Sequence, residues 1–304
     1  MRRTQRTVAR RIVLEGIGLH RGETIRLTID PAGANHGLVF IREDLQDAEV
    51  PALQQFRVPM VNASRLMAGV AAVDTPEHLL AALFALGVDN ATLRINGSEV
   101  PILDGSSLPF AYALLDAGFR ELEAVRGQIV IARKIVIEED SSRLEIHPGK
   151  GLRLTAGIEF EHRHLGYQDV TVRLDDVEDF LRKLAPARTF ALKRDVDQLQ
   201  AAGLIKGGSL ENALLVDEEG VRGSELRFED EFVRHKLLDL VGDLALLGAG
   251  LVGRIVAWRS GHALHGRLVD AILSDPGAWS FESEPAGPSL PRGQPMDPGR
   301  GQGR

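Results

Sequence analysis

Three side chains that can bind a metal follow one another at intervals of four residues in the second half of the chain. His235, Asp239 and Asp243 have this spacing, which puts them on one face of a helix. A histidine nitrogen and a carboxylate oxygen from successive turns can bind one divalent ion, and a third ligand would leave a position for water. Residues 237–246 are mostly apolar, so we expect this polar face to be buried. The alternative is an ordinary surface pair of histidine and aspartate.

The third ligand is predicted at His78, which begins an earlier apolar helix pattern at the place that matches His235. Glu77 precedes His78, and a carboxylate beside a metal ligand can take a proton from metal-bound water. We therefore expect His78, His235 and Asp239 to hold the metal, with Glu77 as the general base. The alternative for Glu77 and His78 is an exposed helix start, where an acidic side chain favours the helix dipole.

Two further segments carry groups that could act beside such a metal. His262 begins a helix pattern after an apolar strand, and it could form a hydrogen bond with Asp243. This contact would keep the imidazole protonated and able to stabilise an oxyanion or donate a proton; the alternative is a plain capping-region histidine. Thr189 and Phe190 offer a hydroxyl and an aromatic ring after Pro186, or are simply the start of a strand.

The elements that would position these residues occur twice along the chain. Each half has alternating strands, then an apolar helix, a strand and a second helix; the matching pairs are 11–31 and 134–148, 78–87 and 235–244, 91–95 and 253–258, and 109–118 and 262–273. This order is typical of an α+β protein and not of a doubly wound parallel sheet. We expect two similar domains, residues 1–124 and 125–280. The alternative is chance similarity between short amphipathic segments.

Composition sets further limits. A chain of 304 residues has room for about two domains, each with its own core. With 36 basic and 43 acidic residues, nucleic acid is not expected as the main partner. The absence of cysteine excludes thiolate ligands and disulfides. We expect no signal peptide and no transmembrane segment, and therefore a cytoplasmic protein. The Pro- and Gly-rich residues 281–304 are expected to be a disordered tail.

Six segments, in this order, resemble one known enzyme family, UDP-3-O-acyl-N-acetylglucosamine deacetylase. They are Gly16–His20, Thr75–His78, Pro101–Ser106, Ala187–Phe190, Phe228–Lys236 with Asp239, and Ser260–Leu264. The resemblance extends from about Gln5 to Leu273, and the run around His235 is its most specific part.

The resemblance implies two similar domains, each a helix layer packed against a β-sheet, with the active site between them. It implies zinc-dependent deacetylation of UDP-3-O-acyl-N-acetylglucosamine to UDP-3-O-acyl-glucosamine and acetate, the committed step of lipid A synthesis in Gram-negative bacteria. His78, His235 and Asp239 would be the Zn²⁺ ligands, and the same ligands suit Fe²⁺. Glu77 would be the general base. His262, oriented by Asp243, and Thr189 would stabilise the oxyanion.

The resemblance also implies substrate contacts. Phe190 would lie against the sugar and Lys236 near the diphosphate. A βαβ-type insert at residues 193–215 would line the acyl-chain passage. The remaining contacts would be Val196, Ile205 and Gly208 in that passage, Phe160 stacked on uracil with Glu159 and Arg143 nearby, and Leu19 and His20.

Several points stay open from the sequence. The same chemistry could act on another nucleotide sugar, or the chain could be a non-catalytic metal protein that binds acylated nucleotides. Either Glu77 or His262 could protonate the leaving amine. The acyl-chain length is not defined, and nothing in the sequence demands more than a monomer.

Overall fold

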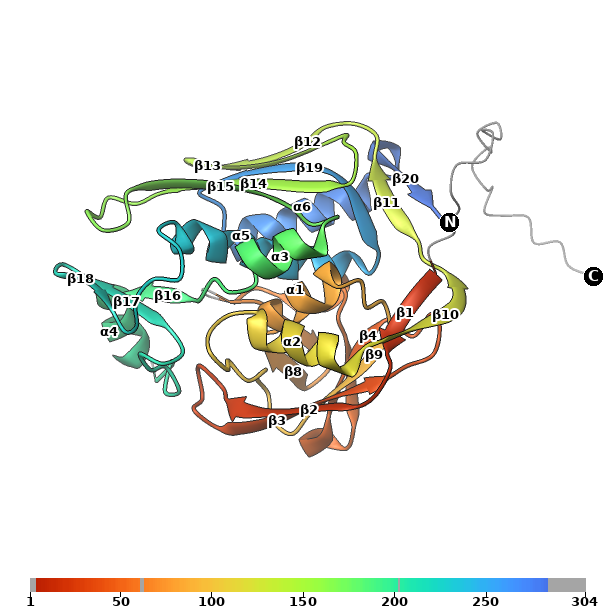
Figure 1. Cartoon of the computed structure of the whole chain (residues 1–304), viewed down its shortest axis with the longest axis horizontal. Helices are drawn as coiled ribbons and strands as arrows, with labels where there is room; N and C mark the ends of the chain where they lie inside the picture. The colour runs from red at the N-terminus through yellow and green to blue at the C-terminus, as the bar shows by residue number, and fades with distance from the viewer. Residues whose placement is uncertain (1–3, 61–62, 202, 284–304) are drawn as a thin grey trace, which may run out of the picture.

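The computed structural model describes residues 4–60, 63–201 and 203–283, and two β-sheets enclose a layer of helices (Figure 1). The first sheet contains, in spatial order, β2 (Ile12–Ile17), β3 (Thr24–Pro31), β9 (Ala91–Ile95), β4 (Leu38–Arg42) and β5 (Ala48–Pro51). The four consecutive residues 39–42 of β4 are all buried, but the other strands alternate. In β3, for example, Ile25, Leu27 and Ile29 are buried while Thr24 and Arg26 are exposed. This alternation is what a sheet covered on one side requires.

The second sheet forms the other outer layer. It contains β12 (Ile135–Glu139), β13 (Ser142–His147), β19 (Gly250–Trp258), β11 (Gln128–Ile131) and β20 (Trp279–Glu282), with β14 (Leu152–Glu159) and β15 (Tyr167–Arg173) beside the later part of β19. The long strand β19 pairs first with β11 and then with β14.

The two sheets repeat one pattern of strand pairing. In the first sheet, β3 is antiparallel to β9, β9 is parallel to β4, and β4 is antiparallel to β5. In the second sheet, β13, β19, β14 and β15 follow the same sequence of antiparallel, parallel and antiparallel pairs. The predicted α+β class is therefore confirmed. The division into two domains near residue 124 stays a prediction.

The helices between the sheets come from both halves of the chain (Figure 1). They are α1 (Glu77–Ala85), α2 (Leu108–Ala117), α5 (Glu231–Leu244) and α6 (His262–Ser274), with α3 (Val177–Lys183) beside them. Helix α1 is apolar on nearly every side and almost completely buried, as expected for a helix in the middle layer. It packs directly against α5, because Gly242 leaves no side chain between the two backbones: a Cβ there would lie 2.1 Å from the Glu77 carbonyl oxygen.

Helix α5 begins one turn earlier than the predicted start at His235. Its first residue, Glu231, is completely buried, and its carboxylate lies 2.8 Å from the Arg188 guanidinium. The same carboxylate accepts hydrogen bonds from the backbone N–H groups of Arg188 and Arg227. These contacts fix the first turn of α5 against the segment that contains Thr189.

The segment predicted as an insert projects from the sandwich as a small unit at the left of Figure 1. Strand β16 (Phe190–Leu192) leads into α4 (Lys193–Ala201), and the chain returns as β17 (Leu214–Asp217), parallel to β16, before β18 (Gly220–Arg222). This is a βαβ arrangement. Two other small sheets complete the fold: β1 (Thr4–Val8) with β10 (Phe119–Val125), and β6 (Arg57–Val58), β7 (Arg65–Ala68) and β8 (Ala71–Asp74).

The predicted tail begins inside an ordered strand, since β20 continues to Glu282 and pairs with β11. Residues 284–304 lie outside the described residues. Among the residues that are described, no helix is both long enough and apolar enough to cross a membrane.

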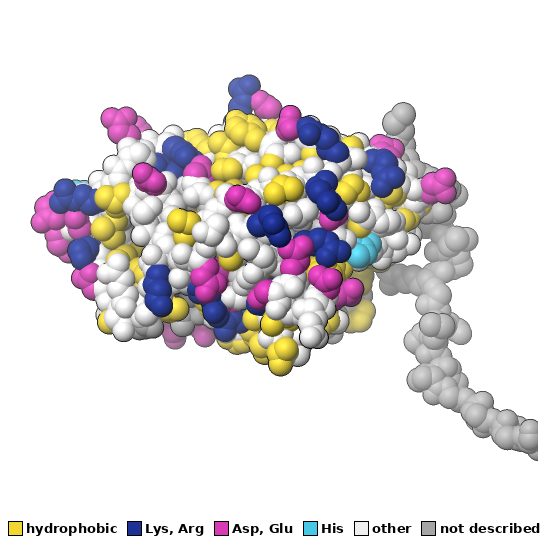
Figure 2. Space-filling model, turned by 90° about the horizontal axis from the view of Figure 1, so that it is seen from below, with side chains coloured by type: hydrophobic (Ala, Val, Ile, Leu, Met, Phe, Trp, Pro, Cys, Tyr) yellow, Lys and Arg dark blue, Asp and Glu magenta, His cyan; other side chains and the backbone are white. Residues whose placement is uncertain are grey.

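Figure 2 shows the molecule from below, with basic and acidic side chains interspersed over this face. On the first sheet and its loops, charged side chains form ion pairs: Arg94 lies 3.6 Å from Asp30 and 3.4 Å from Asp47, and Arg11 lies 2.5 Å from Asp30. This mixture of charge signs agrees with a composition in which acidic residues only slightly outnumber basic ones.

Candidate metal centre and active site

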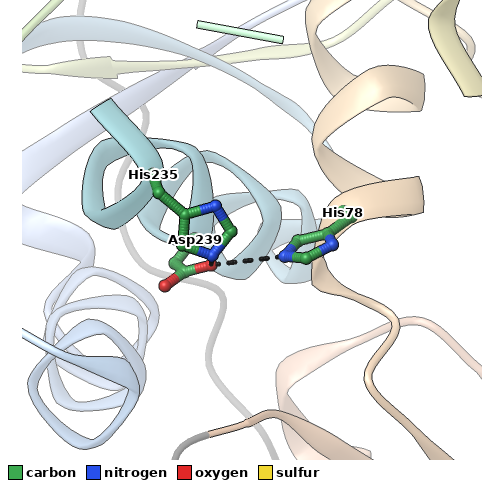
Figure 3. A group of neighbouring side chains, drawn as sticks. All are labelled: His78, His235 and Asp239. Atoms are coloured by element: carbon green, nitrogen blue, oxygen red, sulfur yellow. Dashed lines mark ion pairs between the residues drawn. The ribbon is translucent and has the colours of Figure 1, made fainter. Parts of the chain in front are cut away.

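Helices α1 and α5 bring His78, His235 and Asp239 together (Figure 3). One Asp239 carboxylate oxygen, Oδ1, lies 3.3 Å from His235 Nε2 and 3.7 Å from His78 Nε2. All three candidate ligand atoms lie within 4.8 Å of one another, and all three residues are buried. These are the side chains that the sequence predicted as metal ligands. His235 and Asp239 lie one above the other on the same helix, because they are four residues apart.

The hydrogen bonds of His235 suit a metal ligand. Its Nδ1 lies 3.1 Å from the Ala187 carbonyl oxygen, which can only accept, so Nδ1 carries the proton and Nε2 presents a lone pair toward Asp239. Burial lowers the pKa of His235 to about 4, so the ring is neutral near pH 7. Two imidazoles and a carboxylate that converge in a buried place match the ligand set of a catalytic divalent-metal site.

Glu77 lies in the first turn of α1, directly before His78, and its side chain is buried. Its Oε1 is 4.0 Å from His262 Nε2, and its Oε2 accepts a hydrogen bond from the Ser64 backbone N–H at 3.4 Å. Burial raises the pKa of Glu77 above its ordinary value. A carboxylate with a raised pKa beside a metal site is suited to accepting a proton and passing it on.

His262 begins α6 and lies on the other side of this site. Its Nδ1 is 2.8 Å from Asp243 Oδ2, so the predicted hydrogen bond is present. Its Nε2 points toward the proposed metal ligands and lies 3.8 Å from Asp239 Oδ2. Burial alone would lower the pKa of His262, but the Asp243 carboxylate outweighs it and raises the pKa to about 9. The imidazole is therefore cationic near neutral pH.

Two residues in this network were missed from the sequence. The Ser64 hydroxyl lies 2.5 Å from Asp243 Oδ1, and His265 Nδ1 lies 2.8 Å from Asp243 Oδ2. His265 is one helical turn after His262, a spacing that could have indicated it. Ser64 gives no such signal, because 179 positions separate it from Asp243.

Thr189 lines a cavity that also contains His78, His235 and Asp239, and backbone hydrogen bonds on both sides hold it there. Its N–H donates to the Gly105 carbonyl at 2.8 Å, and its own carbonyl accepts from the Leu214 N–H at 2.9 Å. Gly105 has a φ of +83°, and a Cβ there would lie 2.0 Å from the Asn212 carbonyl oxygen. Only glycine permits this close approach. The Pro101–Ser106 segment thus positions Thr189.

A cavity of about 410 Å³ extends from the three proposed metal ligands to the projecting unit of α4 and β16–β18. The wall formed by this unit is mostly apolar, with Leu192, Val196, Leu199, Leu210 and Leu214. Eight predicted substrate-binding residues line this cavity: Leu19, His20, Phe160, Phe190, Val196, Ile205, Gly208 and Lys236.

A second opening, of about 430 Å³, adjoins the first and shares Phe160 and Lys236 with it. Glu159, also predicted as a substrate contact, lies here with Arg194 and Arg259. Lys236 stands at the junction: its Nζ lies 3.2 Å from Asp239 Oδ2 and 5.5 Å from the centre of the Phe190 ring. The first cavity is therefore mostly apolar away from the proposed metal ligands, whereas the second is lined by both basic and acidic side chains, with Glu161 beside Glu159.

The structure does not bring Arg143 to either of these two cavities. It lies on β13, where its guanidinium contacts Glu138 on the neighbouring strand β12 and Glu145 on its own strand. These two carboxylates satisfy its charge, so the predicted contact of Arg143 with the nucleotide has no support in this geometry.

Comparison with known proteins shows what this chain is similar to. Residues 5–274 match the family model described as UDP-3-O-acyl N-acetylglycosamine deacetylase. A protein named UDP-3-O-acyl-N-acetylglucosamine deacetylase from Anaeromyxobacter sp. (strain Fw109-5) is 43% identical over 274 residues, which are 90% of this chain and 90% of the relative. The Myxococcus xanthus protein is 41% identical over 91% of this chain and 88% of its own length. The Actinobacillus succinogenes protein is 39% identical over 95% of this chain and 96% of its own length.

Proposed function

Since the chain belongs to the UDP-3-O-acyl N-acetylglycosamine deacetylase family, we propose that it removes the N-acetyl group from UDP-3-O-acyl-N-acetylglucosamine and releases acetate. The reaction would be the committed step of lipid A synthesis. The observation that carries this proposal is the placement of a metal-binding triad, a buried carboxylate and a cationic imidazole at one end of an apolar cavity.

His78, His235 and Asp239 would hold one divalent ion, with zinc as the expected metal and Fe²⁺ as the alternative that these ligands also suit. The fit rests on three buried ligand atoms that converge and on the fixed tautomer of His235. When bound, the ion would polarise the amide carbonyl and lower the pKa of the attacking water.

Glu77 would accept the proton of this water as it attacks the amide carbonyl. Its raised pKa supports this role, because a carboxylate with a higher pKa is a stronger base toward the proton of the water. Position is a second support, since Glu77 is adjacent in the chain to the ligand His78 and faces His262 across the site.

His262 and Thr189 would stabilise the oxyanion of the tetrahedral intermediate. His262 contributes positive charge, which Asp243 maintains, and Thr189 contributes a hydroxyl donor. A protonated group must then supply the leaving nitrogen with a proton, and both Glu77 and His262 lie close enough to the cluster to do so.

The two cavities would divide the substrate between them. The apolar cavity would hold the acyl chain along Val196, Ile205 and Gly208, with the sugar against Phe190. The adjoining opening, with Lys236 and Phe160, would hold the diphosphate and uracil. The cytoplasmic location and the monomeric state expected from the sequence stay predictions.

Substrate comparison tests the proposal. The purified full-length chain is incubated with UDP-3-O-acyl-N-acetylglucosamine or with UDP-N-acetylglucosamine, and acetate and free amine are measured together. The proposal predicts equal amounts of both products from the acylated substrate and much slower release from the unacylated one. Release from neither substrate would contradict it.

A further inference from the structure

One carboxylate oxygen serves two imidazole rings beside the proposed active site. Asp243 Oδ2 lies 2.8 Å from Nδ1 of His262 and 2.8 Å from Nδ1 of His265. The two rings are nearly perpendicular, at 71°, with centroids 5.8 Å apart. His262 faces the proposed metal ligand Asp239, whereas the side chain of His265 is completely buried. The carboxylate is thus held from two directions at the oxygen that orients His262.

The surroundings of His265 define which of its nitrogens carries the proton. An ionised carboxylate only accepts hydrogen bonds, so Nδ1 is protonated and donates to Asp243. Burial lowers the pKa of His265, which favours the neutral ring. Its Nε2 then has a free lone pair, and the Ser260 hydroxyl, 3.1 Å away, donates to it. Both ring nitrogens therefore have a partner.

The second of these partners matters for His262 itself. Ser260 and Gly261 are the residues that lead into α6, and His262 is the first residue of that helix. His265 therefore contacts the carboxylate that orients the His262 ring and also the chain that precedes the His262 backbone. In addition, the backbone N–H of His265 donates to the Gly261 carbonyl oxygen at 3.0 Å.

We propose that His265 is a positioning residue for the deacetylation proposed above, acting through Asp243 and Ser260 to aim His262 Nε2 at the reacting amide. His265 does not touch the substrate. It fixes Asp243 Oδ2 so that the His262 ring keeps one orientation, with Nε2 between Asp239 and Glu77. Partners that orient a catalytic or ligating histidine in this way commonly affect activity by about 10- to 100-fold.

Three variants test the proposal by kinetics. His265→Leu removes both hydrogen bonds, and we expect kcat to fall by about 10- to 100-fold with little change in KM. His265→Asn keeps a donor that can reach Asp243, and it should recover most of this loss. Ser260→Ala removes only the second contact and should lower kcat less than His265→Leu. The matched control is His36→Leu, at an exposed histidine that contacts Thr92 on the first sheet.

The outcomes separate positioning from a merely structural role. A kcat in His265→Leu equal to that of the unmodified chain would overturn the proposal, as would a loss in His265→Asn as large as in His265→Leu. Should His265→Leu not fold, the other two variants decide: unchanged kcat in Ser260→Ala together with an inactive but folded His265→Asn would overturn it.

A measurement independent of activity keeps this inference distinct from the proposed function. Histidine-ring ¹⁵N NMR, with His265 assigned by comparison with His265→Asn, should show a neutral ring protonated on Nδ1. A ring protonated on Nε2 would overturn the inference even in an active enzyme. Conversely, an unmodified chain that releases no acetate but shows the expected ring would contradict the proposed function and leave the Asp243–His265 hydrogen bond established.

Discussion

The imidazole rings of His78 and His235 meet edge to face, with their centroids 5.0 Å apart, although they belong to helices from different halves of the chain. The contact exists because α1 and α5 cross at close range in the middle layer of the fold. The distance between the proposed ligands His78 and His235 therefore depends on the distance between α1 and α5. This helix distance can be changed by a substitution at another residue.

Gly242→Ala tests that dependence. The added methyl group would meet the Glu77 carbonyl oxygen, so α1 and α5 must separate. We expect unfolding in denaturant to show a loss of about 1–3 kcal/mol, the usual result of overpacking, and metal affinity to fall with it. Gly33→Ala, where a Cβ has nothing within 4 Å, is the control and should match the unmodified chain. Full metal affinity in Gly242→Ala would contradict the role given to helix spacing.

Glu77→Gln tests the general base. The substitution keeps the size of the side chain and removes its ability to accept a proton, so kcat should fall by about 10²- to 10⁴-fold. Metal content should not change, because Glu77 is not among the three convergent ligands. Rates and bound metal are measured on the same preparation. Undiminished turnover would remove Glu77 from its assigned role.

The pKa of His262 gives a prediction about pH. In the metal-free protein the ring should titrate at about 9, above its ordinary value of 6.5, because Asp243 stabilises the cation. Since the folded-state pKa is raised, this contact stabilises the fold fully below about pH 6.5, and the stabilisation is lost as the pH rises through 9.

The matched variant is Asp243→Asn, which removes the carboxylate that raises the His262 pKa most and leaves only Asp239 and Glu77 to oppose burial. The His262 pKa should then fall from its value of about 9. NMR titration of the histidine rings measures both values. A His262 pKa that is the same with and without the Asp243 carboxylate would show that another group controls its charge.

Much of this site could be predicted from the sequence because its signals are local. His235 and Asp239 lie one turn apart on an apolar helix, and the matching helix in the first half points to His78. The hydrogen bond between His262 and Asp243 followed from the same reasoning, since both segments are helical and lie near each other in the chain. Periodicity also identified helices α1, α2, α5 and α6 and the strands within 11–31, 91–95, 134–148 and 253–258, with errors at their ends, such as the first turn of α5. It did not indicate α3 or the other strands.

The remaining contacts depend on how distant segments meet, and no local pattern encodes that. Ser64 reaches Asp243 only because the first half packs against α5. The backbone hydrogen bond from the Thr189 N–H to the Gly105 carbonyl likewise joins the two halves. Arg143 is the converse case: strand pairing places Glu138 opposite it, Glu145 lies two residues along its own strand, and both carboxylates contact its guanidinium. Its place near the nucleotide stays a prediction.

We propose that His78, His235 and Asp239 hold the metal on which deacetylation depends, and removing the metal and then restoring it is the decisive experiment. The full-length chain is stripped with a chelator, and acetate release from UDP-3-O-acyl-N-acetylglucosamine is followed as zinc is added back. We expect no turnover in the stripped protein and complete recovery at one zinc ion per chain. The His235→Ala variant should neither bind zinc tightly nor recover activity. Full turnover by the stripped protein, or by His235→Ala, would contradict the proposal.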